Sequence, residues 1–255
     1  MTLLGGLQPV DLATLNGAAA LLRRFDAKYI VPVSLLPRLV NGLGAGVRVL
    51  EMGGARSFAY DTTYLDTADL RTFRDHRMGR RRRFKVRERV YSDSPDTASF
   101  IEVKLRGLRD MTAKERWESG LVDGRLRPED ADRVGATIEH HYGERFIDPL
   151  EASLVTSFTR STLFDPVSRE RLTIDADLSV RRPGGPVLRL SSEHALVEVK
   201  SGDPRSRGHT VLASLGVQRR AMSKYCIGIA LTRDVSANAW RPVVRLLAPA
   251  SIVTP

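Results

Sequence analysis

The sequence predicts an α+β protein in which strands enclose a polar, cation-rich interior and helices pack on the outside. Several segments alternate charged and apolar residues with a period of two, the pattern of strands with one polar and one apolar face. Between them lie segments with apolar residues at three-to-four spacing, typical of helices that cover the apolar side of a sheet. The polar faces would then point toward one another across a closed or nearly closed barrel, and its interior would be a tunnel.

The clearest alternation is in RRRRFKVRERVY, residues 80–91. Every odd position from Arg81 to Arg89 is cationic, whereas Phe84, Val86 and Val90 occupy even positions. A helix would scatter these charges around its axis, but a strand places them on one face. Arg81 and Arg83 could extend the row beyond the strand, although a charge run beside a turn is more often solvated.

Six further segments show the same alternation, and we expect each to be a strand. In chain order they are RFDAKYIV at 24–31, FIEVKLRG at 100–107, TAKERWE at 112–118, SFTRSTLF at 157–164, RLTIDADLSV at 171–180 and LVEVKSG at 196–202. A half-buried strand with a solvated face gives the same pattern and is the commoner case for any single strand. These faces differ because they are dense in Arg and Lys, with single carboxylates among them: Glu102, Asp175, Asp177 and Glu198.

The helical pattern predicts helices at about 34–43, 68–76, 128–141, 210–215 and 222–233. An amphipathic helix is expected near the N-terminus, at about 10–22. We therefore divide the chain into an N-terminal helical segment (1–22), one large domain (23–233) and a C-terminal tail (234–255).

Composition narrows the class of partner. The 255 residues carry a formal charge of +10, with an isoelectric point near 10.2, which favours an anionic partner such as nucleic acid, phosphate compounds or an acidic membrane surface. Cys226 is the only cysteine, so an internal disulfide is excluded and a reducing cytoplasm is the simplest compartment. No apolar run approaches the roughly 20 residues of a membrane-spanning helix, and no basic residue precedes the N-terminal apolar stretch as in a secretory signal. A separately encoded membrane partner would leave no trace in this sequence.

Grouping cations inside a protein is costly, because each loses hydration and repels its neighbours. A chain of phosphates would compensate this charge, since Arg offers a planar fork and Lys a point charge to phosphate oxygens. Carboxylates such as Glu198 could hold Mg²⁺ or Mn²⁺ against phosphate, or could pair with a neighbour such as Lys200. The five histidines show no zinc-ligand spacing.

Nine short motifs occur in an order that resembles the VTC domain. They are RFDAKY, TTYLDTADL, RFKVRERVY, FIEVKLRG, TAKERWE, FTRSTLF, RLTIDADLSV, LVEVKSG and SKYCIGI, spread over residues 23–233. The VTC domain is the polyphosphate polymerase domain of vacuolar transporter chaperone proteins, within the CYTH-like triphosphate tunnel metalloenzymes. The resemblance implies an antiparallel barrel tunnel of about eight strands, with a basic lumen and helices outside.

The resemblance also implies roles for individual residues. It implies Arg87, Arg89 and Lys200 as catalytic, and Glu198 as the ligand of a Mn²⁺ or Mg²⁺ cofactor. The family's first strand carries Glu where this chain has Asp26, whose carboxylate reaches about one methylene less far. The implied phosphate-binding residues are Lys28, Lys85, Arg87, Arg89, Lys104, Lys114, Arg160, Arg171, Lys200 and Lys224.

We expect a metal-dependent polymerase that transfers the terminal phosphate of ATP onto polyphosphate, with ATP and polyphosphate as partners. A hydrolase of tripolyphosphate or an organic triphosphate, and a non-catalytic polyphosphate-binding module, are the alternatives. Nucleic-acid binding is disfavoured, because only Phe84 and Tyr91 accompany the basic strand as stacking residues.

Overall fold

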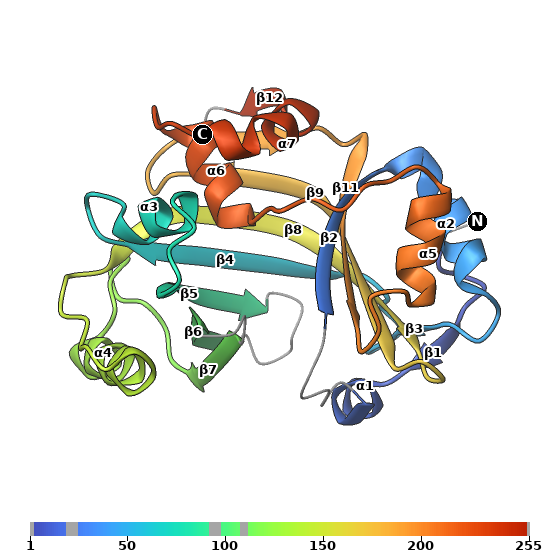
Figure 1. Ribbon diagram of the computed structural model, residues 1–255, viewed down its shortest axis with the longest axis horizontal. Helices are drawn as coiled ribbons and strands as arrows, with labels where there is room; N and C mark the ends of the chain where they lie inside the picture. Colours follow the sequence, from blue (N-terminus) through green and yellow to red (C-terminus); the bar gives the residue numbers. More distant parts are fainter. Residues whose placement is uncertain (1–2, 19–24, 92–97, 108–111, 254–255) are drawn as a thin grey trace.

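The structure is a computed structural model and describes residues 3–18, 25–91, 98–107 and 112–253 (Figure 1). Its described strands form one twelve-stranded sheet. Eight of them follow one another in a continuous antiparallel path. In spatial order these are β2 (Phe25–Pro32), β11 (His194–Ser201), β9 (Glu170–Arg181), β8 (Glu151–Asp165), β4 (Phe58–Asp66), β5 (Arg83–Tyr91), β6 (Ser99–Arg106) and β7 (Thr112–Glu118).

Four short strands extend this path at its sides. β10 (Val187–Leu190) pairs with β9, and β12 (Pro249–Val253) pairs with β10. β3 (Arg48–Leu50) pairs with β8, and β1 (Gln8–Val10) runs parallel to β3.

The sheet is open. Among the described residues, β2 and β7 are the two ends of the eight-strand path and do not pair with each other. The α+β class and the antiparallel strands are confirmed, but the described strands do not form the closed barrel that we expected. Charge alternation fixes the face to which a side chain belongs, whereas it does not specify whether two sheet edges meet.

Helices cover the apolar face of the sheet, as expected. α2 (Leu36–Leu43) and α5 (Arg207–Ser214) pack on β2, β11 and β9, where Val31, Leu39 and Leu212 are fully buried. α4 (Pro128–Tyr142) packs on β5 and β6, with Val86 and Val103 in a second apolar cluster. Figure 1 shows α2 and α5 on one side of the molecule and α4 on the other.

Helix α6 (Lys224–Thr232) packs together with α3 (Arg71–Arg77) and α7 (Arg241–Leu246) at one end of the sheet. Tyr225 and Ile227 of α6 are buried against Leu154 of β8. Gly228 lies so close to Leu154 that an added Cβ would be 2.3 Å from Leu154 Cδ2. α6 therefore fits only because residue 228 has no side chain.

The segment that we expected to be a C-terminal tail is folded onto the sheet. It contains the 3-10 helix η3 (Asn238–Trp240), α7 and β12. Trp240, Val243 and Leu247 are buried in the same apolar cluster as α6.

The remaining local expectations can be compared with the structure directly. Of the helix expected at about 10–22, the structure has α1 at Leu12–Ala18, and positions 19–22 lie outside the described residues. The 3-10 helix η1 (Val33–Leu35) precedes α2. The expected strand at 157–164 is the middle of the longer β8. β4, at the centre of the sheet, was not among the alternating segments. Within the described part of the chain, no helix is long and apolar enough to cross a membrane.

Candidate functional site

Strand register places nine of the ten expected phosphate-binding cations on one face of the sheet. Residues directly opposite each other in antiparallel strands share a face, and alternate residues along a strand share it too. Lys85 of β5 lies opposite Lys104 of β6, which lies opposite Lys114 of β7. At the other end of the strand path, on the same face, Lys28 of β2 lies opposite Glu198 of β11. We call this surface the charged face, defined by Lys28, Lys85, Arg87, Arg89, Lys104, Lys114, Arg160, Arg171 and Lys200, with Lys224 from α6.

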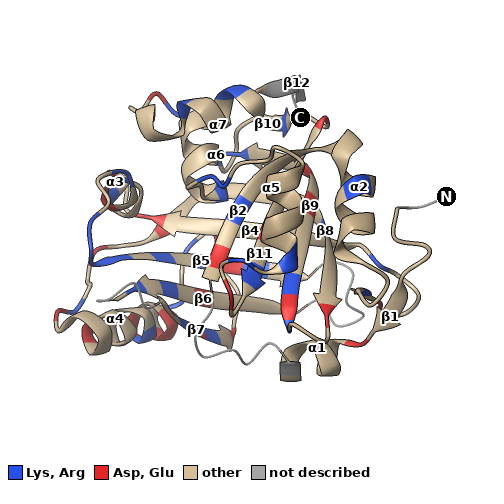
Figure 2. Cartoon of the chain, turned by 45° about the vertical axis from the view of Figure 1, so that its right-hand side comes forward, with Lys and Arg blue, Asp and Glu red and all other residues tan. Residues whose placement is uncertain are grey.

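The charged face is concave enough for strands at opposite ends of the path to interact electrostatically. Lys104 keeps an exposed surface. Partial desolvation by the surrounding protein nevertheless lowers its pKa, and the positive charge of Lys28 lowers it further. Burial lowers the pKa of Lys85 to about 8, and Lys104 and Lys28 contribute to that shift. Figure 2 marks Lys and Arg positions on β2, β5 and β11 in blue. Cations of β2, β5 and β6 therefore face a common space.

Glu102 holds one group of these cations together. Its carboxylate, 1% exposed, accepts a hydrogen bond of 2.7 Å from Arg87 Nε and one of 2.6 Å from Lys114 Nζ. Arg89 Nη1 lies 3.8 Å from the same carboxylate. Burial alone would raise the pKa of Glu102, but Arg87, Arg89 and Lys114 outweigh it and hold the pKa well below the usual range. Glu102 is therefore a buried anion that compensates three neighbouring cations.

Asp175 holds a second group, at the N-terminus of α6. Arg160 donates two hydrogen bonds to its carboxylate, at 2.6 and 2.8 Å, and Lys224 donates a third. Burial would raise the pKa of Asp175, but Lys224 and Arg160 lower it below its usual value. Ser223 caps α6 by accepting a hydrogen bond from the amide of Cys226, which fixes Lys224 at the first turn.

Glu198 lies between two lysines. Lys28 Nζ is 3.6 Å and Lys200 Nζ 3.5 Å from Glu198 Oε1. Burial would raise the pKa of Glu198, but Lys200 and Lys28, together with Arg160, lower it well below the usual value. The carboxylate is ionised and lies among cations. Both roles expected for Glu198, metal ligand and ion-pair partner of a lysine, require this ionised form.

Lys85 and Lys104 differ from the other cations, because neither forms an ion pair or a side-chain hydrogen bond within the described part of the chain. They lie directly opposite each other, and like charges in this position destabilise a sheet. The pair therefore lacks a directly contacting carboxylate such as Glu102 or Asp175, and Glu198 attracts Lys104 only from a longer distance. An anionic ligand would relieve this repulsion.

The sequence did not identify the aromatic residues of β4 that share the charged face. Arg87 lies over the ring of Tyr64 at 6.0 Å, and Arg89 and Arg160 lie over Tyr60 at 5.6 and 5.1 Å. Such contacts stabilise a guanidinium without neutralising its charge. β4 was overlooked because its face residues are neutral, although alternating aromatic and β-branched residues in FAYDTTYLD are a strand signal of their own.

Other expected residues lie elsewhere or in a different state. Asp177, expected among the compensating carboxylates, is exposed at a bulge of β9, has a positive φ of 53° and accepts a hydrogen bond from Thr159. Arg81 is exposed in the turn before β5, whereas Arg83 lies within β5 opposite Arg106. Asp26 lies on the charged face, opposite Lys200.

The described residues form no cluster of three or more carboxylates, histidines or cysteines that would hold a metal by themselves. Mg²⁺ and Mn²⁺ do not need one in phosphate enzymes, because one or two carboxylates suffice when phosphate and water complete the coordination. Glu198, ionised and lying on the charged face, fits such a site better than a closed structural one.

Comparisons with known proteins agree with the motif pattern. The family model of the VTC domain matches residues 23–233. No curated protein matches the chain by sequence. Solved structures with distant similarity include a candidate adenylate cyclase from Bacillus halodurans, with 12% identity, a TM-score of 0.46, and coverage of 78% of this chain and 92% of that one.

Two further solved structures are similar at the same distant level. The PH1012 protein from Pyrococcus horikoshii has 12% identity and a TM-score of 0.42, over 83% of this chain and 100% of that one. A candidate adenylyl cyclase from Hippeastrum, with a dominant triphosphatase activity, has 13% identity and a TM-score of 0.42, over 83% and 97%. These similarities carry no conclusion about the activity of this chain.

Proposed function

The chain belongs to the VTC domain family, and from this premise we propose that it is a metal-dependent polyphosphate polymerase. In this proposal, the terminal phosphate of ATP is transferred to a polyphosphate chain that lies along the charged face. The face would form the wall of a tunnel around that chain. ATP and polyphosphate are the partners, and nucleic acid is not.

One observation carries the proposal: cations on the charged face exceed the carboxylates that could neutralise them. Among the described residues, the ten cations that define the face share it with Asp26, Glu102, Asp175 and Glu198, and the register adds Arg83, Arg106, Arg116 and Glu118, so thirteen cations face five carboxylates. Within the described part of the chain, neither Lys85 nor Lys104 forms an ion pair, although Glu198 and Asp26 attract Lys104 from a longer distance. A ligand with several closely spaced negative charges, such as a row of phosphates, would fit this surplus.

The proposed reaction needs no protein nucleophile. A terminal oxygen of the polyphosphate chain attacks the γ-phosphorus of ATP, a new P–O bond forms, the bond to the β-phosphate oxygen breaks, and ADP leaves with that electron pair. Phosphoryl transfer of this kind depends mainly on positioning and on stabilising charge on the phosphate oxygens. Arg87, Arg89 and Lys200 would supply that stabilisation.

Glu198 would provide the protein's carboxylate oxygen to Mn²⁺ or Mg²⁺. The ion, when bound, neutralises charge on the phosphates during transfer. Lys28 and Lys200, at 3.6 and 3.5 Å from Glu198, would be available to phosphate oxygens if Glu198 held the ion.

The test is an assay of chain growth. Purified protein is incubated with ATP, Mn²⁺ or Mg²⁺ and a short polyphosphate primer, and the products are separated by chain length. The proposal expects long polyphosphate and ADP, and a strong loss of both in Lys104→Ala but not in Arg189→Gln, which removes an exposed charge on β10.

Two outcomes would contradict the proposal. Release of phosphate without chain growth would identify a hydrolase of triphosphates instead. ATP binding with no product of either kind, even with primer present, would identify a binding module.

A further inference from the structure

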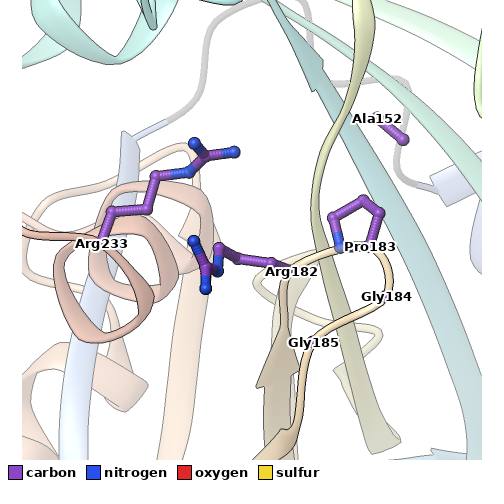
Figure 3. Close-up of a pocket in the computed structure, with 6 residues that line it drawn as sticks. All are labelled: Ala152, Arg182, Pro183, Gly184, Gly185 and Arg233. Carbon is purple, nitrogen blue, oxygen red and sulfur yellow. The ribbon is translucent and has the colours of Figure 1, made fainter.

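A pocket at the far end of α6 contains two arginines that take no part in the charged face. It has a volume of about 340 Å³ and is lined by Ala152, Arg182, Pro183, Gly184, Gly185 and Arg233. Figure 3 shows the side chains of Arg182 and Arg233 reaching into the same space from the β9–β10 turn and from the end of α6. We propose that this pocket, which we call the arginine pocket, binds a phosphate group at a second site.

Neither guanidinium is neutralised by the protein. Within the described part of the chain, Arg182 and Arg233 form no ion pair, and Arg233 Nε is buried without a hydrogen-bond acceptor. Glu151, next to the lining residue Ala152, lies 3.6 Å from Arg125 instead. Buried donors without acceptors are rare in folded proteins, so the missing acceptor points to a ligand.

The chemistry of the pocket selects an oxyanion. Two guanidinium groups that face one space repel each other unless an anion lies between them, and their planar forks match phosphate oxygens. Gly184, with a φ of 69°, has no atom within 4 Å of the position that a Cβ would take. The backbone of this turn is therefore open to close approach by a ligand.

The arginine pocket is separate from the charged face. Lys224, at the start of α6, contacts Asp175 on the charged face, whereas Arg233 directly follows the last residue of the helix. Nine helical residues span roughly 13 Å. Tyr225, Ile227 and Ile229 of α6 are buried in the apolar cluster between the two ends. A phosphate in the pocket therefore needs residues that the proposed polymerase reaction does not use.

The ligand could be free pyrophosphate or one end of a long polyphosphate, and both offer the same oxygens. Isothermal titration of the full chain with each compound distinguishes them. We expect two classes of site in the wild-type protein. In Arg182→Gln/Arg233→Gln, one class should weaken about tenfold or more, because charge-assisted hydrogen bonds are lost.

Loss of pyrophosphate binding in this double variant would identify a site for free pyrophosphate. Loss confined to long polyphosphate would identify a site for the end of the polyphosphate chain. Either result supports the proposed phosphate site. Arg189→Gln, which removes an exposed arginine outside the pocket, should keep both classes. Lys104→Ala should weaken only the other class, so the pocket is tested whether or not the protein makes polyphosphate.

Arg233→Lys keeps the positive charge at the end of α6 and loses the planar fork. It should unfold at the wild-type temperature and still weaken the pocket class, which separates ligand binding from helix stability. The proposal is overturned if the double variant keeps both classes at wild-type affinity, or if Arg189→Gln loses as much binding as the double variant.

Discussion

Replacing Glu102 by Gln tests whether a buried carboxylate holds the charged face together. Glu102 is 1% exposed and contacts Arg87, Lys114 and, at 3.8 Å, Arg89. Removing one partner of a buried ion pair costs about 3–5 kcal/mol, since the remaining charges lose their compensation. Because Lys114 is 43% exposed and can turn to solvent, we expect the lower end, about 3 kcal/mol. For a chain of this size that corresponds to a fall in melting temperature of roughly 6–12 °C.

The assay is thermal unfolding of Glu102→Gln with and without inorganic triphosphate. Triphosphate should restore part of the lost stability, because its oxygens replace the carboxylate beside Arg87 and Lys114. Glu118→Gln is the control, because Glu118 is exposed on β7 and should change stability by no more than about 0.5 kcal/mol.

The stability difference between wild type and Glu102→Gln should also depend on pH in a predictable direction. A carboxyl whose pKa is lowered by folding stabilises the fold above its unfolded pKa, near 4.3 for Glu, and loses that contribution as pH falls further. The stability difference between wild type and Glu102→Gln should thus persist down to about pH 4 and shrink below it. A variant that melts within about 1 °C of wild type at neutral pH would refute the reasoning.

Three further predictions follow from single contacts. The pKa of Lys85 is near 8, so triphosphate affinity should fall above pH 8 by up to about tenfold per pH unit as the ammonium loses its proton. Over the same range the ligand-free fold should gain stability, because Lys85 loses its proton in the folded chain at a lower pH than in the unfolded chain. Lys85→Arg should flatten the affinity profile in binding titrations, and an unchanged slope would assign the titration elsewhere. Gly228→Ala should destabilise by about 1–3 kcal/mol in denaturant unfolding, because its Cβ meets Leu154, and Leu154→Ala in the same chain should recover part of that loss; additive losses would show that the two do not clash. Glu198→Gln should weaken Mn²⁺ binding to the triphosphate complex but not metal-free triphosphate binding, and equal effects on both would make Glu198 a structural partner of Lys28 and Lys200.

The face of each charged strand could be predicted from the sequence, because alternation is a property of the extended backbone itself. Successive side chains of a strand point to opposite sides whatever their tertiary surroundings. Lys28, Lys85 and Lys104 therefore had to lie on the side opposite the apolar residues, and the register of β2, β5 and β6 agrees. The helices that cover the apolar side were predictable for the same local reason.

Only the tertiary structure decided which charges meet. Glu102 accepts from Lys114 on a neighbouring strand, and Asp175 accepts from Lys224 on a helix 49 residues away in sequence. The bulge that turns Asp177 out of the charged face is likewise invisible in a regular alternation, because one extra residue in a strand changes the face of its side chain.

The open edges of the sheet and the arginine pocket were also decided by the tertiary structure alone. Whether β2 meets β7 depends on the accumulated twist and curvature of all the strands between them, which no single segment encodes. Arg182 and Arg233 lie 51 residues apart in sequence and share a pocket only because α6 ends beside the β9–β10 turn. Local backbone geometry thus set the chemistry of each face, and long-range packing set its partners.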